Sequence, residues 1–151
     1  ASLRANVALS ELPDFTCRPG RAADRHHGAG ILLTPSLDYL DAAWFDARRD
    51  GWSSAPVVEL LIPSTIDASL APPGAHVASL FCQHFRRHLP DGRSWAEARQ
   101  SAFDGVVDAV TSYAPNFRRS IVAAHGGQLI AYSGPGCGTT IELTLPGRRR
   151  G

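Results

Sequence analysis

The sequence has 151 residues, of which 44% are hydrophobic and 19% are charged. A chain of this length forms about one domain, and it contains no run of about 20 apolar residues that could span a bilayer. Fifteen basic and fourteen acidic residues give a net charge of +1, so the composition predicts no basic surface for nucleic acid.

Two strands and a long loop are predicted in the first part of the chain. Alternating apolar and polar residues from Leu3 to Leu12 predict a strand. The stretch PDFTCRPGRAADRHHGAG, rich in proline, glycine and charge, predicts a loop. The short apolar run ILLTPS that follows predicts a second strand.

A helix is predicted after this second strand. Thr34 or Ser36 can cap its first turn, and Gly51 stands where the helix should end. Apolar residues spaced three to four apart predict one helical face for packing, made of Leu37, Leu40, Trp44 and Ala47. Two more strands are predicted in PVVELLIPS and HVASLFCQHF, and we expect them to be neighbours in one sheet.

A second helix is predicted to begin at a capping box. Its Ser94 side chain can accept from the amide of Glu97 while the Glu97 carboxylate reaches back. Pro115 ends this helix, whose apolar stripe consists of Trp95, Ala102, Val106, Val110 and Tyr113.

The segments GQLIAYS and TTIELTLP, on either side of a glycine-rich turn, predict an antiparallel hairpin. The elements together predict an α+β fold, in which a mixed or antiparallel sheet is covered by two main helices and followed by a C-terminal β-hairpin.

Four blocks between residues 7 and 121 carry a resemblance to a known family. NVALSELPDFTCRPG, TPSLDYLDAAWFDARRDG, ELLIPSTIDASLAPPGAHVASLFCQHF and SYAPNFRRSI resemble consecutive blocks in the middle, substrate-binding segment of phytoene-desaturase-like FAD-dependent oxidoreductases. The resemblance implies a substrate-domain fragment at residues 1–121, an apolar small-molecule substrate, and a flavin held by a separate dinucleotide fold.

The parts that would hold FAD are not recognised in the sequence. A dinucleotide fold needs GxGxxG between a strand and a helix, and no segment before Gly134 has that pattern. We therefore expect this chain alone not to bind FAD tightly, and we assign no catalytic residue.

A second resemblance covers residues 121–146, within a predicted tail at residues 122–151. IVAAHGGQLIAYSGPGCGTTIELTLP resembles the end of a histidine-kinase ATPase domain, where a helix end leads to a glycine pair and two strands. The resemblance implies a nucleotide phosphate beside Gly136, Gly138 and Thr139. The alternatives are a plain hairpin turn and a noncatalytic binding module, and the kinase elements that bind adenine and magnesium are missing.

Histidine pairs are the other candidate site residues. His26 and His27 match a position where the flavoprotein family carries histidines, which implies a substrate contact; the alternative is a pair of polar residues at a strand edge. His84 and His88 are spaced four apart, but they lie where a strand runs into a loop and have no third ligand, so we predict no metal site.

Three widely separated cysteines suggest neither a disulfide framework nor a metal site, and favour a reducing, cytoplasmic compartment. Cys82 has apolar neighbours and is predicted to be buried, whereas Cys17 and Cys137 fall in loops. Because domains that would cover sheet edges and apolar faces are not recognised, we also expect self-association or marginal stability.

Overall fold

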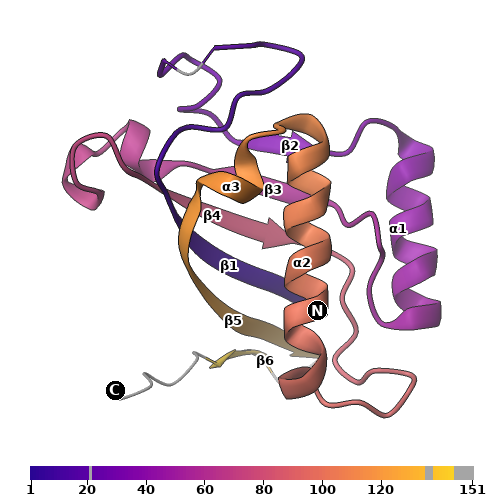
Figure 1. Cartoon of the computed structure of the whole chain (residues 1–151). Coiled ribbons are helices and arrows are strands. Elements are labelled where there is room, and N and C mark those ends of the chain that lie inside the picture. Colours follow the sequence, from indigo (N-terminus) through magenta and orange to yellow (C-terminus); the bar gives the residue numbers. More distant parts are fainter. Residues whose placement is uncertain (21, 135–137, 145–151) are drawn as a thin grey trace.

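The computed structural model describes the backbone of residues 1–20, 22–134 and 138–144, and the side chains of residues 1–20 and 22–124. Within these residues six strands form one sheet, in the order β2–β3–β4–β1–β5–β6 (Figure 1). Every paired strand runs antiparallel to its neighbour. The strands are β1 (Ser2–Leu9), β2 (Ile31–Leu33), β3 (Val58–Leu61), β4 (His76–Cys82), β5 (Ile121–Gly134) and β6 (Gly138–Thr144). The predicted α+β class is confirmed, and the sheet is antiparallel rather than mixed.

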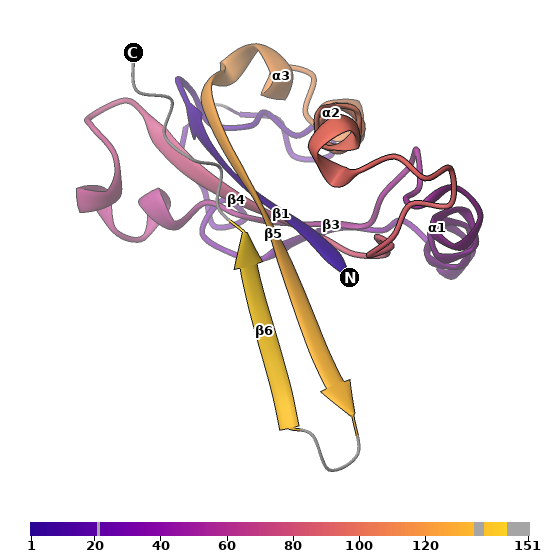
Figure 2. The same ribbon diagram turned by 90° about the horizontal axis from the view of Figure 1, so that it is seen from below.

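Three helices accompany the sheet: α1 (Leu37–Asp50), α2 (Trp95–Tyr113) and the short α3 (Phe117–Ser120). Two single turns of 3₁₀ helix, η1 (Pro63–Thr65) and η2 (Ala68–Leu70), connect β3 to β4. The helices α2 and α3 lie over one face of the sheet, as Figure 2 shows.

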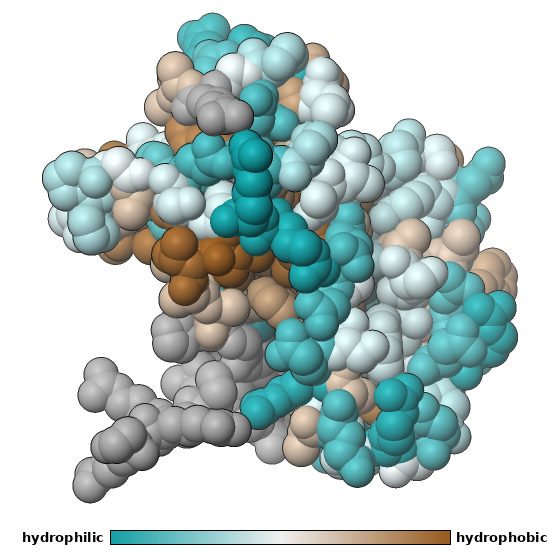
Figure 3. Space-filling model, viewed as in Figure 1, coloured by the Kyte–Doolittle hydropathy of each residue, from teal (hydrophilic) through white to brown (hydrophobic). Residues whose placement is uncertain are grey.

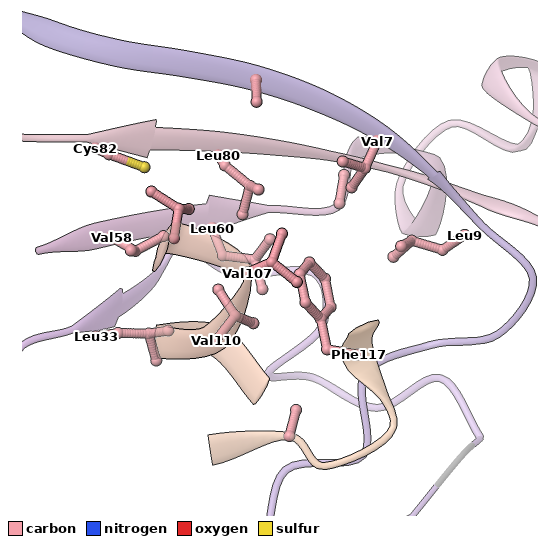
Figure 4. Close-up of a cluster of buried hydrophobic side chains, with 14 of the residues drawn as sticks. Val7, Leu9, Leu33, Val58, Leu60, Leu80, Cys82, Val107, Val110 and Phe117 are labelled. Atoms are coloured by element: carbon pink, nitrogen blue, oxygen red, sulfur yellow. The ribbon is translucent and has the colours of Figure 1, made fainter. Parts of the chain in front are cut away.

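The hydrophobic core lies between α2 and this face of the sheet (Figure 4). Successive strand residues point to opposite faces, so every second residue of a strand can be buried. Leu60 of β3, Leu80 of β4 and Ala5 of β1 stand opposite one another in register and are all buried. From the helix, Val107 and Val110 pack onto this layer, and Phe117 of α3 extends it.

Local signals in the sequence account for α2. Both hydrogen bonds of the Ser94–Glu97 capping box are present: the Ser94 side chain accepts from the Glu97 amide, and the Glu97 side chain accepts from the Ser94 amide. They satisfy amides that a helix leaves without partners at its N-terminus. Its buried side is formed by Ala98, Ala102, Val106, Val107 and Val110. The predicted start, stripe and end of this helix are confirmed, because α2 ends at Tyr113, just before Pro115.

The first helix departs from its predicted face. Its boundaries are as expected, with the Ser36 side chain accepting from the amide of Tyr39 and Gly51 at the C-terminal cap. Ala47 is buried as predicted, but its buried companion is Ala43, whereas Leu37 is 80% exposed and Trp44 41% exposed. The prediction that Leu37 and Trp44 pack against the body of the domain is therefore wrong.

The position of α1 explains this difference. The helix lies beyond the ends of the strands instead of over the sheet (Figures 1 and 2). It is held by hydrogen bonds to neighbouring segments: Tyr39 Oη donates to the carbonyl of Pro56 at 3.0 Å, and Arg86 Nη1 donates to that of Arg48 at 2.8 Å. Gly51 is required at the end of α1, since its φ is +102° and a Cβ there would meet Leu89 at 2.6 Å.

The hairpin of β5 and β6 is confirmed, but β5 begins earlier than predicted. It starts at Ile121 because residues 121–129 pair with β1, so Gly126 and Gly127 lie inside a strand and do not precede one. The far part of the hairpin projects away from the helices (Figure 2). The proposed boundary between residues 121 and 122 stays a prediction.

The thiols are placed as expected where the structure describes them. Cys17 is exposed, and Cys82 is buried in the core, where burial raises the pKa of its thiol to about 12. Cys137 lies outside the described residues. In the part of the chain that the structure describes, no helix is long and apolar enough to cross a membrane.

Candidate functional site

The two sequence-predicted histidines form a cluster with a third. His26 and His27 lie near the end of the long loop after β1, and their rings pack against each other at a tilt of 38° with centroids 3.9 Å apart. Phe15 packs against both rings, edge-on to His26 at 5.9 Å and tilted to His27 at 6.3 Å. His76, the first residue of β4, is linked to this pair through η1, because Ser64 of η1 lies against His76 and Thr65 of η1 bonds to the carbonyl of His27. We call His26, His27 and His76 the histidine cluster.

The ring of His27 holds the loop in place. It is fully buried, and its Nδ1 accepts from the amide of Asp24 at 3.2 Å. Its Nε2 then carries the hydrogen and donates to the carbonyl of Pro13 at 2.9 Å. Both ring nitrogens are therefore used inside the fold, which leaves His27 no polar atom for a ligand.

His26 is the member of the cluster with unused nitrogens. Both are buried and neither has a hydrogen-bond partner, although the side chain as a whole is 19% exposed. Nδ1 lies 3.5 Å from the carboxylate of Asp24, which is too far for a strong hydrogen bond. Burial, with a smaller effect from the neighbouring His27, lowers the pKa of His26, so this imidazole is neutral at pH 7.

His76 brings a serine into the cluster. The Ser64 hydroxyl accepts from the amide of Val77 at 3.0 Å and lies 3.4 Å from His76 Nδ1. Thr65 fixes η1 to the loop by donating to the carbonyl of His27 at 3.1 Å. Burial also lowers the pKa of His76, so His26 and His76 are neutral imidazoles at pH 7 that can exchange hydrogen bonds with a ligand.

Neither His76 nor Ser64 was identified as a site residue from the sequence. A signal existed for His76, because the alternation of β4 puts it on the same face as Ala78 and Leu80. Its approach to the loop depends on the register in which His76 stands opposite Leu9, and no local pattern reveals that register.

The second candidate surface is the face of the sheet that α2 does not cover. We call it the open face; its described side chains include Arg4, Asn6, Ala8, Leu32, Glu59, Leu61, Val77, Ser79 and Phe81, and none of these is buried. Leu32 is 56% exposed and Leu61 42% exposed. The Arg4 guanidinium lies 5.2 Å from the centre of the Phe81 ring, a cation–π contact that covers part of this surface.

The remaining predicted positions do not join these surfaces. Gly138 and Thr139 are the first residues of β6 and pair with Gly134 and Ser133, whereas Gly136 lies outside the described residues. A phosphate site there stays a prediction. His84 lies in the loop after β4, and the described residues contain no group of three or more histidine, cysteine or acidic side chains that could hold a metal.

Most of this chain is similar in sequence to known proteins. It is 40% identical over 123 residues to a mouse protein named pyridine nucleotide-disulfide oxidoreductase domain-containing protein 2, and 38% identical over 122 residues to the rat protein of the same name. Each match covers 78% of this chain and 21% of the relative.

The chain thus spans about a fifth of the length of the curated relatives it matches. No family model matches it. The predicted likeness to a segment of an oxidoreductase is confirmed as sequence similarity to proteins named for an oxidoreductase domain. The likenesses to phytoene desaturases and to a histidine kinase stay predictions.

Proposed function

We propose that this chain is the substrate-binding portion of an FAD-dependent, phytoene-desaturase-like oxidoreductase, and that its open face forms one wall of the cavity for an apolar substrate. The observation that carries the proposal is the 40% identity to an oxidoreductase-domain protein, which coincides with an uncovered sheet face bearing Leu32, Leu61 and Phe81. Exposed apolar side chains gathered on one face favour a ligand or a partner there.

The residues of this chain do not fit FAD itself. A dinucleotide fold binds the pyrophosphate at a helix N-terminus between parallel strands. In the described residues every strand pair is antiparallel, so that part of the chain lacks the crossover unit. The proposal therefore assigns the cofactor to a dinucleotide fold outside the described residues, and the proposed contribution of the chain is to orient the substrate and exclude water.

The histidine cluster has a secondary place in this proposal. Because both nitrogens of His27 are bonded within the fold, the geometry favours His26 over His27 for a polar contact with a substrate. A proton-transfer role would require a substrate in hydrogen-bond reach of His26, and we assign none.

Two titrations of the isolated chain test the proposal. Retinol serves as an apolar polyene probe, followed by quenching of tryptophan fluorescence, and FAD is titrated separately. We expect retinol to bind and FAD not to bind. The double variant Leu61→Ser/Phe81→Ser should weaken retinol binding at least ~10-fold, equivalent to about 1.4 kcal/mol, because both side chains would contact the polyene.

The matched control is Leu37→Ser, which removes an exposed leucine from α1 and should leave retinol affinity unchanged. Circular dichroism checks that each variant melts as the parent does. Equal retinol affinity in the open-face variant and the parent would refute the cavity wall. Tight FAD binding by the chain alone would refute the assignment of cofactor binding to a separate fold.

A further inference from the structure

We propose that the outer side of α1 is a docking site for a protein segment that presents an apolar ridge flanked by lysine or arginine. The outer side consists of Leu37, Asp38, Leu40, Asp41, Trp44 and Phe45, and His84 borders it. This proposal concerns a different surface from the open face and does not rest on the proposed redox function.

The apolar side chains of this surface are not needed to hold α1 in place. The helix is buried through Ala43 and Ala47, while Phe45 is 64% exposed and Leu37 80% exposed. A shallow hollow is lined by Leu40, Trp44, Phe45, Asp41 and His84. Burying exposed leucine and phenylalanine side chains is favourable, so a partner that covered this surface would gain binding free energy that the fold does not use.

The aromatic residues are held in a defined arrangement. Trp44 and Phe45 meet edge to face with centroids 4.9 Å apart, and the Arg48 guanidinium lies 4.8 Å from the centre of the Trp44 ring. Ordered aromatic and arginine side chains lose little entropy when a partner binds, and they dominate the energy of many interfaces.

The border of the hollow contains a strained residue. His84 has a φ of +64°, which is uncommon for a residue with a side chain. Hydrogen bonds on its C-terminal side maintain this conformation, since the Phe85 amide donates to Ala1 O at 3.1 Å and the Arg86 amide donates to Gly51 O at 2.8 Å. Backbone strain of this kind is concentrated at binding sites.

The charges at the rim select the partner. Asp46 and Asp50 are paired with Arg49 at 2.9 and 2.7 Å. Asp38 and Asp41, in contrast, are exposed and form no ion pair with any residue that the structure describes. An anionic lipid headgroup, or a second copy that apposed the first turns of the two α1 helices, would bring negative charge against these carboxylates, whereas a basic protein segment complements them.

Two synthetic helical peptides with the same leucine ridge test this inference on the full chain. One peptide has lysine on both flanks of the ridge and the other has glutamate. We expect the lysine peptide to bind, detected by Trp44 fluorescence and calorimetry, and the glutamate peptide to bind at least ~10-fold more weakly. Added salt should reduce this preference, because the rim charges are exposed.

Three variants locate the site. Phe45→Ser should weaken binding of the lysine peptide about ten-fold, because it removes a large exposed side chain that contacts the peptide. Asp38→Asn/Asp41→Asn should bring the two peptides to within about two-fold of each other. Ile66→Ser is the matched control, because Ile66 is 77% exposed but lies in the turn after η1, so it should change neither affinity.

Several results would overturn the proposal. They are the absence of binding by the lysine peptide, equal affinity for both peptides, and equal weakening by Ile66→Ser. A dimer that Phe45→Ser converts to monomer would identify a second copy as the occupant and would also overturn it. If the chain bound phosphatidylcholine vesicles and Phe45→Ser abolished that binding, the occupant would be a lipid surface and the proposal would be wrong. Unchanged melting temperatures of the variants ensure that these results report binding.

Discussion

His26 is held where protonation is unfavourable. Its two nitrogens are buried without hydrogen-bond partners, and its ring packs at a tilt against that of His27. Burial lowers the pKa of His26, and it also lowers those of His76 and His84; only the Asp24 carboxylate, 3.5 Å from His26, acts in the opposite direction. In the unfolded chain these side chains regain the ordinary pKa of about 6.5.

This difference sets the sign of a pH dependence. Below the ordinary pKa the unfolded chain binds more protons than the folded chain, so stability is complete above about pH 6.5 and decreases as pH falls through the folded pKa values. The variant His26→Phe keeps an aromatic ring against Phe15 and His27 and removes the imidazole that titrates. We expect its melting temperature to fall less than that of the parent between pH 7 and pH 5.

The same measurement on His88→Phe provides the control, since His88 is exposed and lies outside the cluster. The carboxylates of Asp24, Asp91 and Glu97 contribute little to the change in stability between pH 7 and pH 5, because hydrogen bonds lower their pKa and keep them ionised. A pH profile of His26→Phe that superimposes on the parent profile would show that His26 does not contribute to acid sensitivity.

Asn116 links the end of α2 to the segment after β1. Its side chain is buried between α2 and α3, where Oδ1 accepts from the Asp14 amide at 2.7 Å and Nδ2 donates to the Leu12 carbonyl at 2.9 Å. These contacts join residues more than 100 positions apart. One side chain therefore fixes where the long loop leaves the sheet.

Replacing this residue should destabilise the fold measurably. Asn116→Leu removes both hydrogen bonds, and each buried group that loses its partner costs about 1–3 kcal/mol, so we expect a loss of about 2–4 kcal/mol in the free energy of unfolding by urea. Gln100→Ala, on the exposed side of α2, should change stability by no more than about 0.5 kcal/mol. A loss below about 1 kcal/mol for Asn116→Leu would mean that the loop is anchored elsewhere.

The two main helices show how far the sequence predicts this fold. For α2, the capping box, the apolar period and the following proline all act within a few residues, so local patterns were sufficient. For α1, the period predicted the helix and the buried Ala47, but the preference for burying large side chains selected Leu37 and Trp44 and missed Ala43. The buried face depends on where the helix sits relative to the strands, and that is decided by the tertiary fold.

For the candidate site too, the sequence predicted local features but not contacts between distant parts of the chain. The adjacent pair His26 and His27 could be identified from the sequence, but their different roles follow from which nitrogens meet Asp24 and Pro13. His76 joins them through the pairing of β4 with β1, which links distant parts of the chain. The early start of β5 has the same origin, because residues 121–127 are extended by pairing with β1.

The edge formed by β5 matters for the molecule as a whole. β6 pairs with β5 only from Gln128 to Gly134, so residues 121–127 of β5 have β1 on one side and no second strand among the described residues. Val122 on this edge is 67% exposed, and Figure 3 shows a hydrophobic patch over the start of β5 next to α3. The stretch IVAAHGG contains no acidic or basic residue apart from His125 to discourage pairing with another chain.

We therefore expect the isolated chain to self-associate through this edge, with an average mass in sedimentation velocity that rises with concentration. Val122→Lys places a charge on the edge and should shift the chain toward monomer, because a lysine disfavours pairing with another strand at this position. Ile66→Lys adds the same charge in the turn after η1 and should leave association unchanged. If the parent chain stayed monomeric at every concentration, or if both variants dissociated it equally, the first half of β5 would not be the contact surface. Dissociation by Val122→Lys alone would locate the contact between copies at the first half of β5.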